Sequence, residues 1–287
     1  DIPEEVVVGA AISGRIVREG GDVRNFALDF ESFISDTKTV VEAGACFVHL
    51  DVGGVTKIQE SGLTTPQIYD KLFKGIEGAT KHDWVRDANI LRGNSFAENV
   101  YPITAGYVET IPMAPNFPVD WMEAVAKVAT DHDVRVFLVA HSTAEVDLAN
   151  RLIISKGLLP KPTCWDVLIG YPYDDATDRL GTFVAHPRAM MTELMQIIDR
   201  IKEIDPNAFI LVNASGRAGH YLATQGMLMG YHVRTGTEDM AFRFPHKDEL
   251  LGGNLETIER AKMTATALGR RLATPNEFRR MIGLKQR

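Results

Sequence analysis

Short apolar runs alternate with amphipathic stretches along the whole chain. The runs have the length of buried β-strands rather than of helices. We therefore predict eight strands, at residues 6–13, 46–52, 84–91, 107–113, 134–140, 164–170, 208–213 and 232–237.

Helical periodicity fills most of the segments between these runs. Apolar positions that recur every three or four residues predict five helices, at residues 30–43, 118–131, 142–156, 187–202 and 254–269. Asp29 is placed to cap the first of these helices, and Gly44 is placed to end it. Asn254 is expected to cap the last one. Trp121 heads the apolar stripe of the second helix.

Eight strand–helix units in 287 residues predict a closed (β/α)8 barrel, or TIM barrel, that takes up residues 1–287 as one domain. A doubly wound open sheet is the rival, and that fold binds dinucleotides with a glycine-rich loop after its first strand. Residues 11–15 read Ala-Ile-Ser-Gly-Arg, with one glycine, and do not fit that loop. Because active sites of such barrels lie at the carboxyl ends of the strands, polar residues there are the candidates for chemistry.

The composition narrows the class of protein. Apolar residues make up 45% of the chain and charged residues 24%, which is typical of a globular protein. The 31 basic and 38 acidic residues give a net charge of −7, so we expect neither nucleic acid nor an anionic membrane as a partner. No apolar run reaches the roughly 18 residues of a membrane span, and residues 1–5 do not resemble a signal peptide. Cys46 and Cys164 lie in apolar runs and are expected to be buried free thiols of a cytoplasmic protein.

Two polar residues, His49 and Asp51, end the second predicted strand. Side chains two apart on a strand point to the same face, so we expect both at the active end of the barrel. An imidazole and a carboxylate placed together can bind one divalent metal. A hydrogen bond between the two that only fills the barrel interior is the competing interpretation.

The eighth predicted strand carries His232, Arg234, Gly236 and Glu238 on one face. If that face points inward, Arg234 is a cation inside the barrel and Glu238 lies at its mouth. The planar guanidinium group suits a substrate carboxylate, which it can bind through two hydrogen bonds. A buried Arg234–Glu238 ion pair with a structural role is the alternative.

Four residues that follow other strands are predicted to contact the substrate. Asn213 and Ser215 lie where the seventh strand turns into a helix, and the backbone N–H groups of such a turn can bind an anion. Asn116 follows the fourth strand, and His141 follows the fifth. A structural interpretation stays open as well, a tight turn for residues 213–215 and a helix cap for His141.

Several segments together resemble one protein family. Residues 41–50 read Val-Glu-Ala-Gly-Ala-Cys-Phe-Val-His-Leu, and residues 116–117 and 215–217 read Asn-Phe and Ser-Gly-Arg. Residues 230–239 read Gly-Tyr-His-Val-Arg-Thr-Gly-Thr-Glu-Asp, and residues 269–279 read Gly-Arg-Arg-Leu-Ala-Thr-Pro-Asn-Glu-Phe-Arg. In this order, the motifs resemble the β-keto acid cleavage enzymes, a family of (β/α)8 barrels.

The resemblance implies a reaction and a cofactor. The family joins a β-keto acid and acetyl-CoA, and forms acetoacetate and a new acyl-CoA. A divalent metal, usually zinc, is held by a His-x-His pair on the second strand and a Glu on the eighth, and it polarises the keto oxygen. Carried over to this sequence, the metal ligands are His49 and Glu238, while Arg234 and Asp239 serve the substrate carboxylate and catalysis. The resemblance also implies a homodimer or homotetramer.

This sequence departs from the family at two places. Asp51 stands where the family has its second metal-binding histidine, so we predict a more anionic shell that suits Fe(II) or Mn(II) as well as zinc. After the first strand, Arg15 and Ile16 stand where the family has a carboxylate. We expect the segment that starts at Arg15 to close over the pocket. Its arginines suit an anionic substrate or a CoA phosphate, or else serve only to solvate the surface.

Three functions are therefore open. The first is a metal-dependent enzyme that cleaves a C–C bond next to a carbonyl in a small carboxylate substrate, with or without acetyl-CoA as co-substrate. The second is a non-haem Fe(II) dioxygenase on the same barrel, in which His49 and Asp51 need one more ligand. His141, His220 or Glu238 is placed to supply it. The third is a binder of small carboxylates that has no metal.

Overall fold

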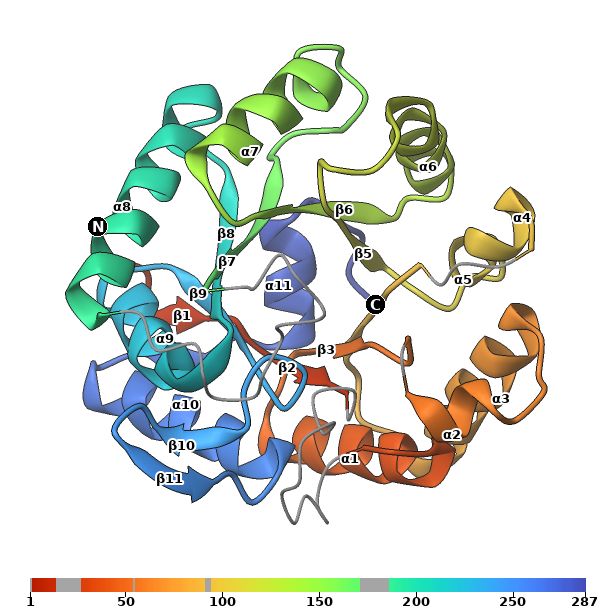
Figure 1. The fold of residues 1–287 in the computed structure, drawn as a ribbon, viewed down its shortest axis with the longest axis horizontal. Helices are drawn as coiled ribbons and strands as arrows, with labels where there is room; N and C mark the ends of the chain where they lie inside the picture. The colour runs from red at the N-terminus through yellow and green to blue at the C-terminus, as the bar shows by residue number, and fades with distance from the viewer. Residues whose placement is uncertain (1, 14–26, 54, 91–93, 171–185) are drawn as a thin grey trace.

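The computed structural model describes residues 2–13, 27–53, 55–90, 94–170 and 186–287. Within these residues, eight parallel strands pair in chain order and close into a barrel (Figure 1). The strands are β2 (Val8–Ile12), β3 (Phe47–Leu50), β4 (Val85–Ala88), β5 (Thr110–Met113), β6 (Arg135–Ala140), β7 (Cys164–Ile169), β8 (Phe209–Ala214) and β9 (His232–Thr235). The predicted (β/α)8 fold and all eight predicted strands are confirmed.

Helices surround the barrel on its outer side (Figure 1). The described α-helices are α1 (Phe30–Ala43), α2 (Thr56–Gln59), α3 (Thr65–Ala79), α4 (Phe96–Asn99), α5 (Tyr101–Thr104), α6 (Val119–Asp131), α7 (Thr143–Ala149), α8 (Pro187–Ile204), α9 (Gly219–Leu228), α10 (Asn254–Ala267) and α11 (Pro275–Met281). A π-helical turn, η2 (Asn150–Ile154), extends α7, and a 3-10 turn, η3 (Gly216–Ala218), precedes α9. In the described part of the chain, none of these helices has the length and apolar character of a membrane span.

Two small sheets lie outside the barrel. β1 (Glu5–Val6) pairs in parallel with β12 (Arg271–Leu272), so a segment near the start of the chain lies beside one that follows α10. β10 (Phe242–Phe244) and β11 (Lys247–Leu250) form an antiparallel hairpin after the last barrel strand.

The five predicted helices correspond to α1, α6, α7 with η2, α8 and α10. Asp29 caps α1 by accepting a hydrogen bond from the Ser32 N–H at 3.0 Å, and Gly44 ends the helix in the left-handed conformation. The predicted cap at Asn254 is wrong, because Gly253 takes the cap position of α10. The Asn254 side chain instead accepts a hydrogen bond from the Thr237 N–H at 2.9 Å, and so braces the turn after β9.

Six of the described helices, α2, α3, α4, α5, α9 and α11, were not among the predicted ones, and the two longest of them are α3 and α9. α3 begins with a capping box at Thr64 and buries Ile68, Leu72 and Ile76, so its sequence carries an ordinary helical signal. The buried face of α9 recurs at helical spacing but is made partly of small residues, Gly219, Ala223 and Gly226, so its apolar pattern is weak. These small residues let the helix pack closely on the barrel. A Cβ atom at Gly226 would lie 2.8 Å from the Val212 Cβ of β8.

Apolar side chains form two core layers. The larger layer lies between the strands and the surrounding helices. The second layer fills the barrel at the amino ends of the strands, where Phe47, Phe137 and Phe209 surround Phe278 of α11, with ring centroids 5.3, 6.3 and 5.4 Å from it. α11 therefore closes this end of the barrel (Figure 1) and leaves the carboxyl end for polar side chains.

The two cysteines belong to the second layer. Cys46 and Cys164 are buried free thiols, as predicted. Burial raises the pKa of each thiol to about 12, so both are inert at neutral pH.

A buried ion network fixes α11 to the barrel. Arg279 is fully buried and donates hydrogen bonds to both carboxylate oxygens of Asp83, at 2.5 and 2.9 Å. It also donates to Oε1 of buried Glu109 at 2.7 Å. Loss of the guanidinium group would leave Glu109 without its nearest cation, which is costly inside a protein.

We expect Arg279→Leu to lower the free energy of unfolding by about 3–5 kcal/mol, because a carboxylate stays buried without its partner. Urea denaturation measures this change. Arg280→Leu replaces the exposed neighbour on the same helix and is the control, with an expected change within about 0.5 kcal/mol. Equal losses in the two variants would show that α11 does not depend on the network.

Candidate active site

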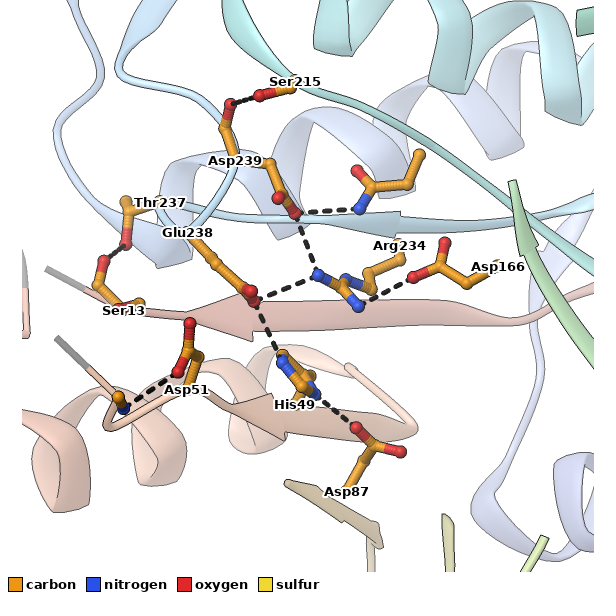
Figure 2. A network of polar contacts seen from close by, with 12 residues as sticks. Ser13, His49, Asp51, Asp87, Asp166, Ser215, Arg234, Thr237, Glu238 and Asp239 are labelled. Atoms are coloured by element: carbon orange, nitrogen blue, oxygen red, sulfur yellow. Dashed lines mark hydrogen bonds and ion pairs between the residues drawn. The ribbon is translucent and has the colours of Figure 1, made fainter. Parts of the chain in front are cut away.

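A cavity of about 410 Å³ lies at the carboxyl ends of the strands, where the fold predicts an active site. Six charged or ionisable side chains from β3, β7, β9 and the turns that follow them line one part of it. They are His49, Asp51, Asp166, Arg234, Glu238 and Asp239. Figure 2 shows how these side chains gather around Arg234 and His49.

The strand register holds His49 from one side. His49 of β3 pairs with Asp87 of β4, and His49 Nδ1 makes a short hydrogen bond to Asp87 Oδ1. The Thr110 hydroxyl of β5 donates a hydrogen bond to the other oxygen of Asp87 at 2.5 Å. Because an ionised carboxylate can only accept a hydrogen bond, Nδ1 of His49 carries the proton in this bond. Nε2 is therefore the ring nitrogen that faces the cavity.

The second ring nitrogen of His49 faces Glu238. Nε2 lies 3.2 Å from Glu238 Oε2, yet it is buried and makes no hydrogen bond with the described residues. Burial alone would lower the pKa of His49, but the carboxylates of Glu238 and Asp87 outweigh it and raise the pKa to about 10. Two groups that both bind divalent metals therefore point at one another.

The backbone after β9 brings Glu238 to this position. Gly236 has a φ of +156°, and a Cβ atom there would lie 2.1 Å from the carbonyl oxygen of Ala11 in β2. The close approach lets the Glu238 N–H donate a hydrogen bond to that oxygen at 3.2 Å. Only glycine fits at residue 236, so the Gly-x-Glu spacing positions the carboxylate opposite His49.

Arg234 is buried and holds three carboxylates together (Figure 2). Its Nη1 donates to Asp166 Oδ2 at 2.7 Å, and its Nη2 donates to Glu238 Oε2 at 3.0 Å and Asp239 Oδ2 at 3.2 Å. The Asn213 amide donates to the same Asp239 oxygen at 2.8 Å. The Arg234–Glu238 ion pair is therefore present, and it forms part of a larger network at the cavity.

The network carries more negative than positive charge. Five buried carboxylates surround Arg234 and His49, namely those of Asp51, Asp87, Asp166, Glu238 and Asp239. Burial raises the pKa of Asp166 to about 6 although it contacts Arg234. A raised pKa favours the protonated form of a group. Protonation of Asp166 or His49 therefore lowers the negative charge of the site. Such a site attracts a cation.

The residues present offer two converging metal ligands. Among the described residues, no group of three or more His, Cys, Asp or Glu side chains is arranged to hold a metal ion. Asp51 lines the cavity, and its Oδ1 accepts a hydrogen bond from the Gly53 N–H at 2.9 Å. The buried Nε2 of His49 and the excess of carboxylates nevertheless fit a divalent cation, which His49 and Glu238 would hold with Asp51 as a further candidate.

The predicted substrate residues at or after the ends of β5, β6 and β8 fall into two groups. Asn116 and His141 line the cavity, and His141 Nδ1 lies 2.8 Å from Glu145 Oε2. Asn213 and Ser215 are not among the described lining residues. Both hold Asp239 in place, because the Ser215 hydroxyl donates to the Asp239 carbonyl oxygen at 3.3 Å.

Two further candidate residues, His220 and Arg15, are not among the described residues that line the cavity. His220, considered as a third iron ligand, lies on α9 and lines a different surface pocket with Arg260. Arg15 and Ile16 lie outside the described residues, so their predicted place over the pocket is not described by this structure.

Two carboxylates of the site were missed by sequence reasoning. Asp87 and Asp166 each interrupt an apolar strand, and a charged residue at such a position signals a buried partner. Their partners come from other strands, and strand register is not visible in the sequence. Trp121 was assigned to the core stripe of α6, and it packs partly buried against the core but also lines the cavity.

The fold and the site define a (β/α)8 barrel with a buried histidine–carboxylate centre at the carboxyl ends of its strands. The model of the beta-keto acid cleavage enzyme family matches residues 5–284. The chain therefore belongs to the β-keto acid cleavage enzyme family.

Two relatives carry the same name, 3-keto-5-aminohexanoate cleavage enzyme. The one from Acetoanaerobium sticklandii is 24% identical over 303 residues, which cover 99% of this chain and 100% of the relative. The one from Fusobacterium nucleatum subsp. nucleatum is 39% identical over 71 residues, 25% of each chain. Family and relatives support an enzyme that cleaves a C–C bond.

Solved structures agree on the fold. The apo structure of ObcA superimposes with a TM-score of 0.69 at 17% identity, and the match covers 91% of this chain and 66% of ObcA. The type I 3-dehydroquinate dehydratase of Clostridium difficile gives a TM-score of 0.58 at 12% identity over 93% of each chain. At such identities the likeness shows the barrel fold alone.

We expect Gly236→Ala to destabilise the protein by more than about 3 kcal/mol, because the added Cβ would meet backbone atoms of Ala11. Gly269→Ala is the matched control. Gly269 also has a positive φ, but nothing lies within 4 Å of a Cβ there. That variant is expected to lose about 1 kcal/mol from backbone strain alone. Urea denaturation of both variants measures the loss of stability, and similar losses in the two would contradict the steric argument.

Proposed function

We propose that this enzyme transfers an acyl group between a β-keto acid and acetyl-CoA in a metal-dependent reaction. An acid R–CO–CH2–COO⁻ and acetyl-CoA would give acetoacetate and R–CO–CoA, so that one C–C bond is broken and one is formed. The observation that carries the proposal is the buried pair of His49 Nε2 and Glu238 Oε2, 3.2 Å apart, beside Arg234 in the cavity of a family member.

His49 and Glu238 would hold the divalent ion, with Asp51 as the third candidate ligand. The hydrogen bond to Asp87 keeps the His49 ring in the orientation that presents Nε2. When bound, the ion supplies Lewis acidity toward the substrate keto oxygen. One imidazole and two carboxylates suit zinc, Fe(II) or Mn(II).

Arg234 would bind the substrate carboxylate. A guanidinium group has five N–H donors, and three of them reach Asp166, Glu238 and Asp239. Nε of Arg234 is buried and makes no hydrogen bond with the described residues, so the group keeps donor capacity for an acid. Asp239, held by Asn213, would orient Arg234 or take part in moving a proton.

The direct test supplies metal, acetyl-CoA and a series of 3-oxo acids to the purified protein, and measures acetoacetate and acyl-CoA by liquid chromatography. Formation of both products in equal amounts supports the proposal. The rival dioxygenase function predicts oxygen uptake by the iron-loaded protein and no dependence on acetyl-CoA. Such oxygen uptake would contradict the proposed transfer reaction and support the dioxygenase function.

His49→Ala and Glu238→Gln are each expected to lower the bound metal from about one ion per chain to less than about 0.1, because each removes a ligand. Elemental analysis of protein loaded with metal and then desalted measures this. His82→Ala, an exposed histidine, serves as the control and should keep the metal. Full metal content in His49→Ala would refute the proposed site.

Arg234→Lys is expected to lower kcat/KM by about 30-fold to 1000-fold, or about 2–4 kcal/mol, while the protein stays folded. Lysine keeps the charge, but its single nitrogen cannot hold three carboxylates and a substrate acid. Arg151→Lys on the exposed surface of η2 is the control. Near-normal turnover of Arg234→Lys would assign Arg234 a structural role.

A further inference from the structure

The cavity has two chemically different sides. Charged side chains of the Arg234 network form one side. The other described lining residues include seven apolar side chains, from Ile90, Pro112, Ala114, Phe117, Trp121, Val139 and Leu168, and three neutral polar or weakly basic ones, from Asn89, Asn116 and His141.

The strand order places most of these residues opposite the charged side. β9 and β3, which carry Arg234 and His49, both pair with β2. In a closed barrel of eight strands, β5 and β6 lie across the ring from β9 and β2. Pro112 belongs to β5, Val139 belongs to β6, and Trp121 belongs to the helix between them. A substrate with its acid group at Arg234 would therefore extend toward the apolar side.

An aromatic pair forms the outer part of the apolar side. The rings of Phe117 and Trp121 lie 4.8 Å apart, centroid to centroid, at an angle of 37°. Phe117 is 37% exposed, so the pair offers apolar surface that a ligand can cover. Covering such surface favours an apolar group on the ligand.

The carboxylates that line the cavity belong to the opposite side. Asp166, Glu238 and Asp239 bind Arg234, and Asp51 follows β3. None of the described lining residues from β4, β5, α6 or β6 is a carboxylate. Among the described residues, an ammonium group on the substrate tail would meet the neutral amides of Asn89 and Asn116 but no carboxylate, so it would lose water without gaining a counter-charge there, which is costly.

We infer that this enzyme selects β-keto acids whose tail beyond the keto carbon is uncharged and apolar, an inference that rests on the proposed function. The tail would lie against Ile90, Pro112, Phe117 and Trp121. By its name, the relative from Acetoanaerobium sticklandii acts on a keto acid with an amino group on that tail. The two proteins would thus differ in the tail that they accept.

A matched pair of substrates tests the inference. 3-Oxo-5-methylhexanoate carries a methyl group at C5, where 3-oxo-5-aminohexanoate carries an ammonium group of similar size. We expect kcat/KM to be at least about 100-fold higher for the methyl compound, mostly through KM. Equal values, or a preference for the amino compound, would overturn the inference while the proposed function stands. Cleavage of neither compound, nor of any other 3-oxo acid, would instead refute the proposed function.

Two substitutions in α6 test whether the substrate tail lies at Trp121. Trp121→Glu places a carboxylate on the apolar side and is expected to reduce the preference for the methyl compound at least tenfold. Val119→Glu adds the same charge at an exposed residue of α6 that is not among the described lining residues, and should leave the preference unchanged. An unchanged preference in Trp121→Glu would show that the tail does not lie at Trp121. If thermal melting shows that Trp121→Glu is unfolded, the substrate pair on the wild-type enzyme decides alone.

Discussion

The burial of Arg234 among carboxylates is the constraint on which the carboxyl end of this barrel depends. A buried carboxylate without a partner costs several kcal/mol, and here one guanidinium group reaches Asp166, Glu238 and Asp239. The same contacts tie the middle of β7 to the turn after β9. They also hold Glu238 where it faces His49, so the network that stabilises this end of the barrel also builds the candidate site.

The two ends of the barrel treat buried charge differently. At the amino end, Arg279 meets Asp83 and Glu109, and Arg287 lies 3.7 Å from Glu109, so two cations face two carboxylates. At the carboxyl end, five buried carboxylates among the described residues surround Arg234 and His49. A network with equal numbers of cations and anions serves packing, whereas an excess of carboxylates creates a negative local field that favours a bound cation or a proton. This difference marks the carboxyl end as the candidate site without reference to any relative.

Much of the fold could be predicted, because each barrel strand is a short apolar run and five of the longer helices show their own periodicity. Arg86 and Asp87 interrupt the apolar run of β4, and the structure explains both. Arg86 pairs with Glu77 at 3.3 Å, and Asp87 turns inward to His49. The buried face of α9 includes Gly219, Ala223 and Gly226, and such small residues give a weak apolar pattern.

The candidate site could be predicted only where neighbours in sequence share a strand face. That reasoning brought His49 together with Asp51, and Arg234 together with Glu238. It could not find Asp166, whose partner comes from another strand, because register between strands depends on packing. It also placed Asn213 at the correct end of the barrel, but its contact with Asp239 depends on turn geometry that no local pattern encodes.

The order of the strands separates the Arg234 network from the apolar side of the cavity. Every member of the Arg234 network comes from β7, β8, β9 or the turn that follows β9, and His49 comes from β3. The described apolar side of the cavity is built mainly from β4, β5, α6 and β6, and none of its residues bonds to Arg234. Side chains such as Phe117 and Trp121 can therefore differ between enzymes without unbalancing the buried charges. A barrel arranged in this way can keep one reaction centre while its substrate range changes on the opposite wall.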